Sequence, residues 1–254
     1  MPQVPQVPPV PPPPAERPPR PERPDQGEFD PPLATWSPLE AVPVLVMALV
    51  LAFLADAVVM AVIPGCASAF VVASFLGELA FAVAVLVWVR FVNRGPLAAL
   101  GAPRHPLGDI GTGFAGGLLL TVAGLAAAAI VLAVGRAILG HQPAQPQQIE
   151  TCVGGAWLPL SGIVVILAAP FGEELFFRGF LYKGLRRRYP PWKAALISGA
   201  AFSLIHVQPI LVLALFPVGV GLAMVYEQRQ SVLASMVAHA TFNVIGFLSI
   251  IHAR

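Results

Sequence analysis

The stretch of sequence that decides the fold reads Ala169-Pro170-Phe171-Gly172-Glu173-Glu174-Leu175-Phe176-Phe177-Arg178-Gly179-Phe180. It lies in an apolar segment that starts near Trp157 and reaches a basic end at residues 183–188. Two adjacent carboxylates are costly there, because insertion of one acidic residue at membrane depth costs about 2.5–3.5 kcal/mol. Such groups face a polar cavity or a partner, so we expect the rest of the protein to be arranged around this pair.

The composition is that of a membrane protein with several spans. Of the 254 residues, 57% are hydrophobic and 11% are charged, and the mean hydropathy is +0.77. A soluble domain carries roughly 25% charged residues. The net charge of only +2 argues against a nucleic-acid partner, which would need clustered basic residues on an accessible face. The expected surroundings are therefore the lipid bilayer.

Apolar stretches recur along the chain at lengths suited to membrane helices, for which about 20 residues are needed. They cover residues 39–63, 68–89, 111–133, 157–181, 194–207, 210–226 and 232–251. This pattern predicts an all-α polytopic helix bundle with about seven transmembrane helices, and an eighth is left open. The fifth stretch is short, which predicts a turn at Gln208-Pro209 within the membrane.

The N-terminal region has a different composition. Residues 1–32 contain 14 of the 28 prolines and too little apolar surface to form a core. We expect residues 1–38 to be a disordered, proline-rich cytoplasmic tail and residues 39–254 to be the membrane domain, with a catalytic core at 157–251.

The distribution of Lys and Arg predicts the orientation. With the tail inside, 13 of the 15 basic residues fall on the cytoplasmic side, and only Arg136 and Arg254 fall outside. The positive-inside rule then favours a cytoplasmic N terminus. Cys66 and Cys152 have no CxxC or ligand spacing, so we interpret them as ordinary small apolar residues; a disulfide is the alternative, since both fall in loops placed outside.

Glycines within the stretch 111–133 do not have the pattern of a phosphate-binding loop. The run from Gly111 to Gly117 lacks the Lys-Ser/Thr ending of such loops. We expect Gly113 and Gly117 to serve close helix packing instead.

Helical spacing separates the roles of the two glutamates. Adjacent residues on a helix point about 100° apart, so Glu173 and Glu174 cannot occupy the same position in a cavity. Glu174 and Arg178 are spaced i, i+4 with the acid first, the order that favours an ion pair, and we assign this pair an orienting role. Glu173 is then left to meet a reacting group.

Other polar groups reach a similar depth from two further segments. Phe202 and His206 share one helix face by their i, i+4 spacing, and so do His239 and Asn243. Counted from the cytoplasmic ends of their segments, Glu173, His206 and Asn243 lie roughly 20 Å deep, and His239 about 14 Å. These four groups can therefore meet in one cleft, which we expect to open towards the cytoplasm.

This set of groups predicts peptide hydrolysis. A carboxylate next to an imidazole can act as a general base on water, and a second imidazole with a carboxamide can stabilise the oxyanion. Equally, Glu173, His206 and His239 could hold zinc or another divalent ion that activates the water, although HExxH is absent. Asp56 and Glu78 also lie in apolar stretches, but neither has a matched polar partner at helical spacing, so we favour structural roles for both.

Three motifs in this order resemble those of the CPBP family, also called Abi, which includes the prenyl-protein CAAX endopeptidases. They are Glu173-Glu174-x-x-x-Arg178, Phe202-x-x-x-His206 and His239-x-x-x-Asn243. The resemblance implies a membrane protease, of either a glutamate-dependent or a metalloprotease type, in the plasma membrane of a bacterium. In it Glu173 and His206 would activate water, His239 and Asn243 would stabilise the oxyanion, and Glu174, Arg178 and Phe202 would have supporting roles.

Two other functions stay open at this level. One is a catalytically silent membrane scaffold or bacteriocin self-immunity factor that keeps the motifs for folding. The other is a proton-coupled transporter, in which buried Glu and His residues relay protons. The expected partner of the enzyme is a protein or peptide substrate at the membrane, whether prenylated or not, and the sequence does not indicate an oligomeric state.

Overall fold

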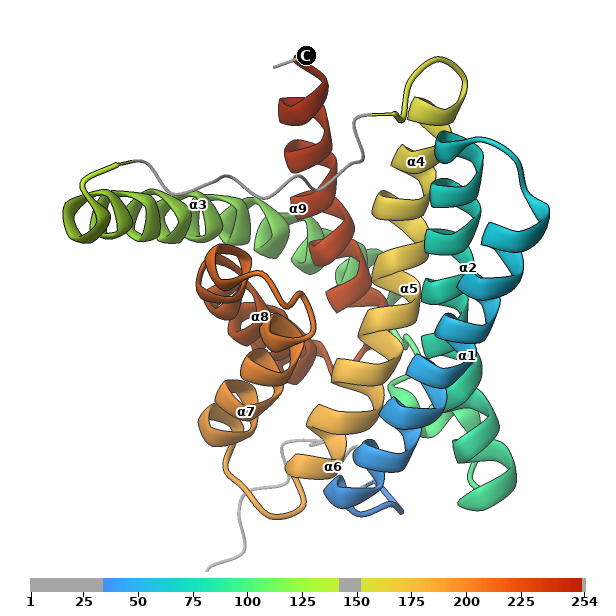
Figure 1. Cartoon of the computed structure of the whole chain (residues 1–254). Helices are drawn as coiled ribbons and strands as arrows, with labels where there is room; N and C mark the ends of the chain where they lie inside the picture. Colours follow the sequence, from blue (N-terminus) through green and yellow to red (C-terminus); the bar gives the residue numbers. More distant parts are fainter. Residues whose placement is uncertain (1–33, 142–151, 253–254) are drawn as a thin grey trace, which may run out of the picture. The chain divides into compact units, whose positions relative to one another are not determined.

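The computed structural model describes residues 34–141 and 152–252, and their regular structure is entirely helical (Figure 1). The predicted all-α membrane bundle is thus confirmed. In chain order the main helices are α1 Ala41–Val62, α2 Cys66–Val87, α3 Pro106–Leu139, α4 Trp157–Ile163, α5 Ala169–Glu174, α6 Lys183–Leu185, α7 Pro191–Leu204, α8 Pro209–Arg229 and α9 Val232–His252. Short 3-10 or π-helical segments accompany them: η1 Pro38–Glu40, η2 Trp88–Val92, η3 Leu97–Leu100, η4 Val164–Ala168 and η5 Leu175–Tyr182.

Six helical stretches of the described residues, one fewer than the seven expected, are long and apolar enough to cross a membrane. They are Pro38–Val62, Cys66–Val92, Pro106–Leu139, Trp157–Leu185, Pro209–Arg229 and Val232–His252. The exception is α7, which has only 14 residues. It ends early because Pro209 opens α8 and keeps the preceding Gln208 in an extended conformation, so the chain turns where the sequence predicted.

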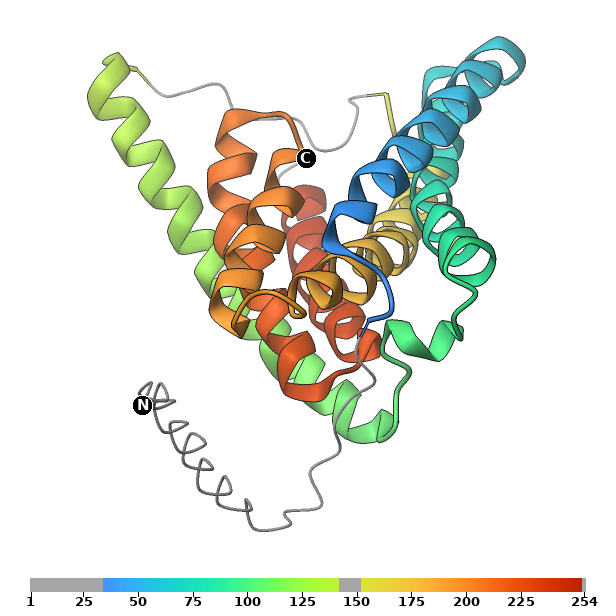
Figure 2. The same ribbon diagram turned by 90° about the horizontal axis from the view of Figure 1, so that it is seen from below.

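The helices that carry the motifs lie in the middle of the arrangement. Seen from below, the continuous run Trp157–Leu185 lies between the α1–α2 pair and the group formed by α7, α8 and α9 (Figure 2). Helix α3 packs on the other side of that group, against α8 and α9. The central run therefore has a neighbour on each side that can place a polar group against it.

Two glycines bring α3 close to α9, as their pattern predicted. A Cβ atom at Gly113 would lie 2.5 Å from the carbonyl oxygen of Ala234, and one at Gly117 would lie 2.6 Å from that of Ala238. No real side chain fits at such distances, so the two backbones are in direct contact. Since His239 follows Ala238 on α9, this contact also helps to position His239.

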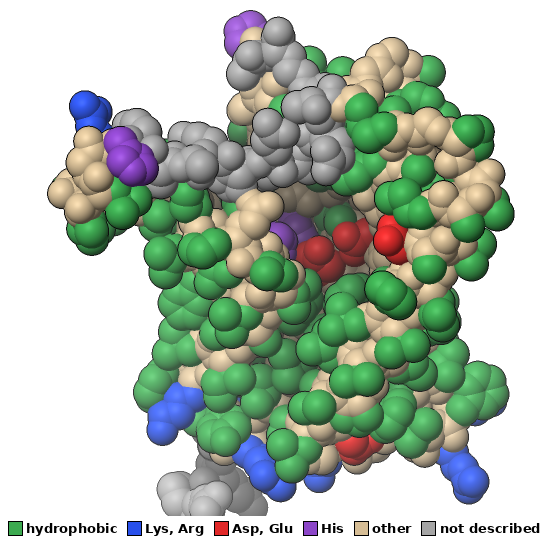
Figure 3. All heavy atoms as spheres, in the orientation of Figure 1, with side chains coloured by type: hydrophobic (Ala, Val, Ile, Leu, Met, Phe, Trp, Pro, Cys, Tyr) green, Lys and Arg blue, Asp and Glu red, His purple; other side chains and the backbone are tan. Residues whose placement is uncertain are grey.

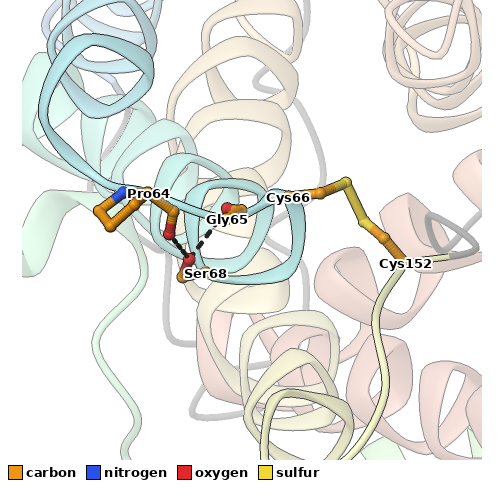
Figure 4. The surroundings of a disulfide bond; sticks show 5 residues. All are labelled: Pro64, Gly65, Cys66, Ser68 and Cys152. Atoms are coloured by element: carbon orange, nitrogen blue, oxygen red, sulfur yellow. Dashed lines mark hydrogen bonds between the residues drawn. A yellow bond between two sulfur atoms is a disulfide. The ribbon is translucent and has the colours of Figure 1, made fainter.

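The two cysteines form a disulfide, so the interpretation of Cys66 and Cys152 as ordinary apolar residues is wrong (Figure 4). The bond joins the start of α2 to the segment that precedes α4, across 86 residues of sequence. Ser68 supports the turn before Cys66, because its hydroxyl donates to the carbonyl of Gly65 at 2.9 Å. The placement of both cysteines on the outer side left a disulfide open, but a separation of 86 residues did not reveal that the two loops meet.

The last residues of the predicted tail pack on the membrane domain. Trp36 is fully buried, its ring stacks on Phe180 with 4.9 Å between centroids, and its indole N–H donates to the Phe180 carbonyl at 2.8 Å. Ser37 then caps η1 by a capping box with Glu40. The remainder of the predicted disordered tail, residues 1–33, lies outside the described residues.

Candidate active site

The acidic pair lies on α5 between two π-helical segments, η4 and η5. Pro170, near the start of α5, has no backbone N–H, and its ring would clash with the carbonyl four residues earlier in a regular helix. That carbonyl belongs to Ile166, within η4, so the wider π turn accommodates the proline. Such π segments are frequent at functional sites, where they redirect side chains and free carbonyl groups.

Glu174 is held by one partner from the next turn of the same run and by one from α9. It is fully buried, and its Oε1 accepts hydrogen bonds from Arg178 Nη1 at 2.8 Å and from His239 Nδ1 at 2.9 Å. Arg178 is also fully buried, and its Nη2 donates to the Gly219 carbonyl on α8 at 2.9 Å. The structure thus contains the i, i+4 ion pair that the spacing indicated, and the pair ties the central run to α8 and α9.

Glu173 has a different environment from its neighbour. Its residue exposure is 8%, and its Oε2 is buried with no hydrogen-bond partner among the described residues. The nearest basic nitrogen is Nε2 of His239. It lies 4.0 Å from Oε2 of Glu173, which is beyond hydrogen-bond distance. Oε2 of Glu174 is likewise buried without a partner, but its Oε1 accepts two hydrogen bonds. Glu173 accepts none from the described residues, so its carboxylate is available for a molecule that enters the site.

His206 lies in the turn after α7, not on the helix itself, because α7 ends at Leu204. Its Nδ1 lies 3.0 Å from the carbonyl oxygen of Phe202. A carbonyl only accepts hydrogen bonds, so Nδ1 carries a proton and Nε2 of the neutral ring carries the lone pair. Burial lowers the pKa of His206, which lies outside the six candidate spans, although the hydrogen bond to Phe202 opposes this effect. The ring is therefore neutral at pH 7 and can accept a proton.

Phe202 stands between the two histidines. Its ring centroid is 5.3 Å from that of His206 and 5.6 Å from that of His239, and the Arg178 guanidinium lies 4.6 Å from the same ring. Phe202 therefore packs against both imidazoles and the Arg178 guanidinium. The imidazole of His239 also lies next to Glu173 and Glu174.

Asn243 lies on α9 one turn beyond His239, but it faces η4. Its Nδ2 donates to the carbonyl of Val165 at 2.7 Å. This hydrogen bond uses one of the two amide hydrogens and leaves the other. The sequence analysis did not foresee this partner. In the π register of η4 the donor for the Val165 carbonyl would be Pro170, which has no N–H, and a sequence does not reveal where a π segment forms.

Glu78, for which the sequence favoured a structural role, lies beside Glu173. The two carboxylates are close enough for their charges to interact, and Glu78 Oε2 is buried without a hydrogen-bond partner. A sequence signal was present: Glu78 is 12 residues from Arg90, which gives a depth of roughly 18 Å, similar to that of Glu173. Figure 3 shows acidic side chains and a histidine gathered in a hollow of an otherwise hydrophobic face.

The predicted metal ligands do not form a metal site in this arrangement. The part of the chain that the structure describes contains no group of three or more His, Cys, Asp or Glu side chains placed to hold an ion. Nδ1 of His206 faces the Phe202 carbonyl and Nδ1 of His239 faces Glu174, so Nε2 of each ring has no such partner within the described residues. The reaction proposed below uses no metal step.

Comparison with known proteins agrees with the motifs. Residues 155–245, about a third of the chain, match the family model described as "Type II CAAX prenyl endopeptidase Rce1-like". A search of the curated proteins and a search of the solved structures each found no match. The family and the six apolar helices together identify an integral membrane protein. Residues 155–245, which carry every residue of this cluster except Glu78, thus match the Rce1-like family of CAAX prenyl endopeptidases, as the motifs indicated.

Proposed function

We propose that this protein is an intramembrane endopeptidase of the CAAX type, in which Glu173 activates a water molecule for hydrolysis of a peptide bond. The observation that carries the proposal is the contrast between adjacent glutamates. Oε1 of Glu174 accepts hydrogen bonds from Arg178 and His239, although its Oε2 is buried without a partner. Glu173, in contrast, accepts no hydrogen bond from the described residues, and its Oε2 is also buried. A purely structural pair would be expected to have both carboxylates engaged, because an unpaired buried charge is strongly destabilising.

The proposed reaction begins with the transfer of a proton from water to Glu173. The water oxygen bonds to the carbonyl carbon, the C=O electrons move to the oxygen, and a tetrahedral oxyanion forms. His206 supports this step, because the lone pair on Nε2 can accept a hydrogen bond from the same water. Glu173 then gives the proton to the leaving nitrogen as the C–N bond breaks, which restores the carboxylate.

His239 and Asn243 are the groups that would stabilise the oxyanion. Asn243 has a second amide hydrogen, since only one is used by the Val165 carbonyl. For His239 the role requires a proton on Nε2, because Nδ1 already faces Glu174. Removal of one such donor typically lowers kcat by about 10²–10³.

We also propose that the N terminus is cytoplasmic. Lys and Arg side chains gather at the lower end of the molecule in the view of Figure 3. The disulfide between Cys66 and Cys152 lies at the opposite end of α2 from Arg90. Because disulfides persist in oxidising compartments and basic loops stay inside, both features support the same orientation.

The test is peptide cleavage by the purified full chain in detergent. The substrates are a synthetic peptide that ends in a prenylated Cys-a-a-X sequence and its unprenylated counterpart. We expect Glu173→Gln to lower kcat by about 10²–10⁴, the size ordinary for a general base, and His206→Ala to lower it as well. Asp56→Asn is the matched control, because Asp56 is an exposed acid on α1.

Two results would contradict the proposal. Equal cleavage by the wild type and Glu173→Gln would show that this carboxylate is not the base. If the folded wild type cleaves neither peptide, the catalytically silent scaffold becomes the better function.

A further inference from the structure

Glu78 is a buried acidic residue without an assigned role, and it lies outside the segment that matches the family. It is contributed by α2, and its Oε2 has no hydrogen-bond partner among the described residues. Oε2 of Glu173 and Oε2 of Glu174 are in the same state, but Glu174 accepts two hydrogen bonds through Oε1, whereas Glu78 and Glu173 accept none from the described residues. Two unpartnered carboxylate oxygens that interact electrostatically across one helix contact need an explanation, because a buried polar atom is normally hydrogen-bonded.

The backbone fixes the two carboxylates relative to each other. Gly172, directly before Glu173, packs on the backbone carbonyl of Glu78 so closely that an added Cβ would collide with that oxygen. The contact sets α2 against α5 at the residues that carry the acids. Glu78 is therefore held beside Glu173 by main-chain packing, which does not depend on the side chains themselves.

Two more features hold α2 against the central run. The disulfide Cys66–Cys152 joins the start of α2 to the segment before α4. Next to it, Val71 of α2 packs in one buried cluster with Val153 and Val164. The α2 helix is thus tied to the central run from the disulfide down to Gly172, so the relative position of the two acids is well defined.

Among the described residues, no donor lies within hydrogen-bond distance of these two oxygens. The ionisable groups around Glu173 are Glu78, Glu174, Arg178 and His239, whose Nε2 is 4.0 Å from Glu173 Oε2. Arg178 donates to Glu174 and to Gly219, and His239 donates to Glu174 from Nδ1. A water molecule, which has two hydrogens to donate, fits the need of two nearby carboxylate oxygens, since buried waters typically bind groups that lack other partners.

We propose that Glu78 is a further catalytic residue, which holds the nucleophilic water together with Glu173. This inference rests on the proposed endopeptidase function. One hydrogen of the water points to Glu173, which receives it as a proton. The other points between Glu78 and Nε2 of His206, which share it as a three-centre hydrogen bond, and it stays on the oxygen. With both hydrogens directed at these acceptors, a lone pair of the water oxygen faces the substrate carbonyl, so the attack needs less reorientation.

The test compares three variants of the full chain by steady-state kinetics and thermal unfolding in detergent. Glu78→Leu removes the acceptor and keeps a side chain of similar size, so we expect kcat to fall about 100-fold with KM unchanged. Glu78→Gln keeps a carbonyl oxygen that can accept the hydrogen bond, and we expect it to lose only about tenfold. Asp56→Asn, an exposed acid on the neighbouring α1, should leave both constants unchanged.

The outcomes separate this inference from the proposed function. If Glu78→Leu and Glu78→Gln both keep wild-type kcat while Glu173→Gln is inactive, only the role of Glu78 is wrong. If the two Glu78 variants lose the same kcat in proportion to lost thermal stability, Glu78 is a structural residue. If Glu173→Gln is as active as the wild type, both proposals fail. Should Glu78→Leu not fold, the partial activity of Glu78→Gln at unchanged KM remains the deciding result.

Discussion

The acidic cluster has two halves that differ in how their charges are met. In the paired half, Glu174 is fully buried and its Oε1 accepts hydrogen bonds from Arg178 and His239. In the unpaired half, Glu78 and Glu173 accept no hydrogen bond from the described residues; the Oε2 of each is buried without a partner, as is Oε2 of Glu174, whose Oε1 is engaged. The difference teaches that adjacent residues of one motif can serve separate purposes: paired buried charges fix the helices, and unpaired ones are available for chemistry.

In the paired half, the largest loss of stability is expected from a substitution of Arg178. Arg178→Ala leaves the Glu174 carboxylate buried without its ion-pair partner, which costs about 3–5 kcal/mol of stability. The measurement is thermal or denaturant unfolding in detergent. Arg186→Ala is the matched control, because the Arg186–Glu227 pair is partly exposed, and its loss should cost at most about 1 kcal/mol. Equal effects of the two substitutions would contradict the structural role of the paired half.

The second test concerns the disulfide, which ties α2, the helix that carries Glu78 of the unpaired half, to the segment before α4. Replacing both Cys66 and Cys152 by Ser should lower the stability by about 2–4 kcal/mol, because the open chain has more conformational freedom when unfolded. Addition of a reductant should lower the unfolding temperature of the wild type and leave that of the double variant unchanged. A wild type that does not respond to reductant would show that the bond adds no stability.

The smallest expected effect is at the contact between Gly172 of α5 and the Glu78 backbone of α2, which holds the two acids of the unpaired half side by side. In an exposed helix, Gly→Ala usually stabilises by up to about 1 kcal/mol. Gly172→Ala should instead cost about 1–3 kcal/mol and lower kcat, because its methyl group would meet the Glu78 carbonyl. Gly77→Ala on α2 has nothing within 4 Å of its Cβ and should be neutral or stabilising. A neutral Gly172→Ala, measured by unfolding and kinetics, would mean that this contact does not hold the two acids.

Much of the fold and part of the site follow from patterns within single helices. The lengths of the apolar stretches predicted the membrane helices, and the spacing of Gly113 and Gly117 predicted a close contact between helices. The i, i+4 spacing gave the Glu174–Arg178 pair, because a helix fixes which of its own residues share a face. The short stretch at 194–207 also predicted the turn before Pro209, although it was counted as a span.

The sequence alone therefore determined the helical class and the pairing inside α5–η5. Only the tertiary structure decided which groups meet between helices: His239 with Glu174, Asn243 with Val165, Glu78 with Glu173, and Cys66 with Cys152. The physical reason is that these helices are apolar on nearly every side, so their sequence period does not fix how each is rotated against its neighbours. That rotation is set by contacts such as the one between Gly172 and the Glu78 backbone, which no spacing along the chain reveals.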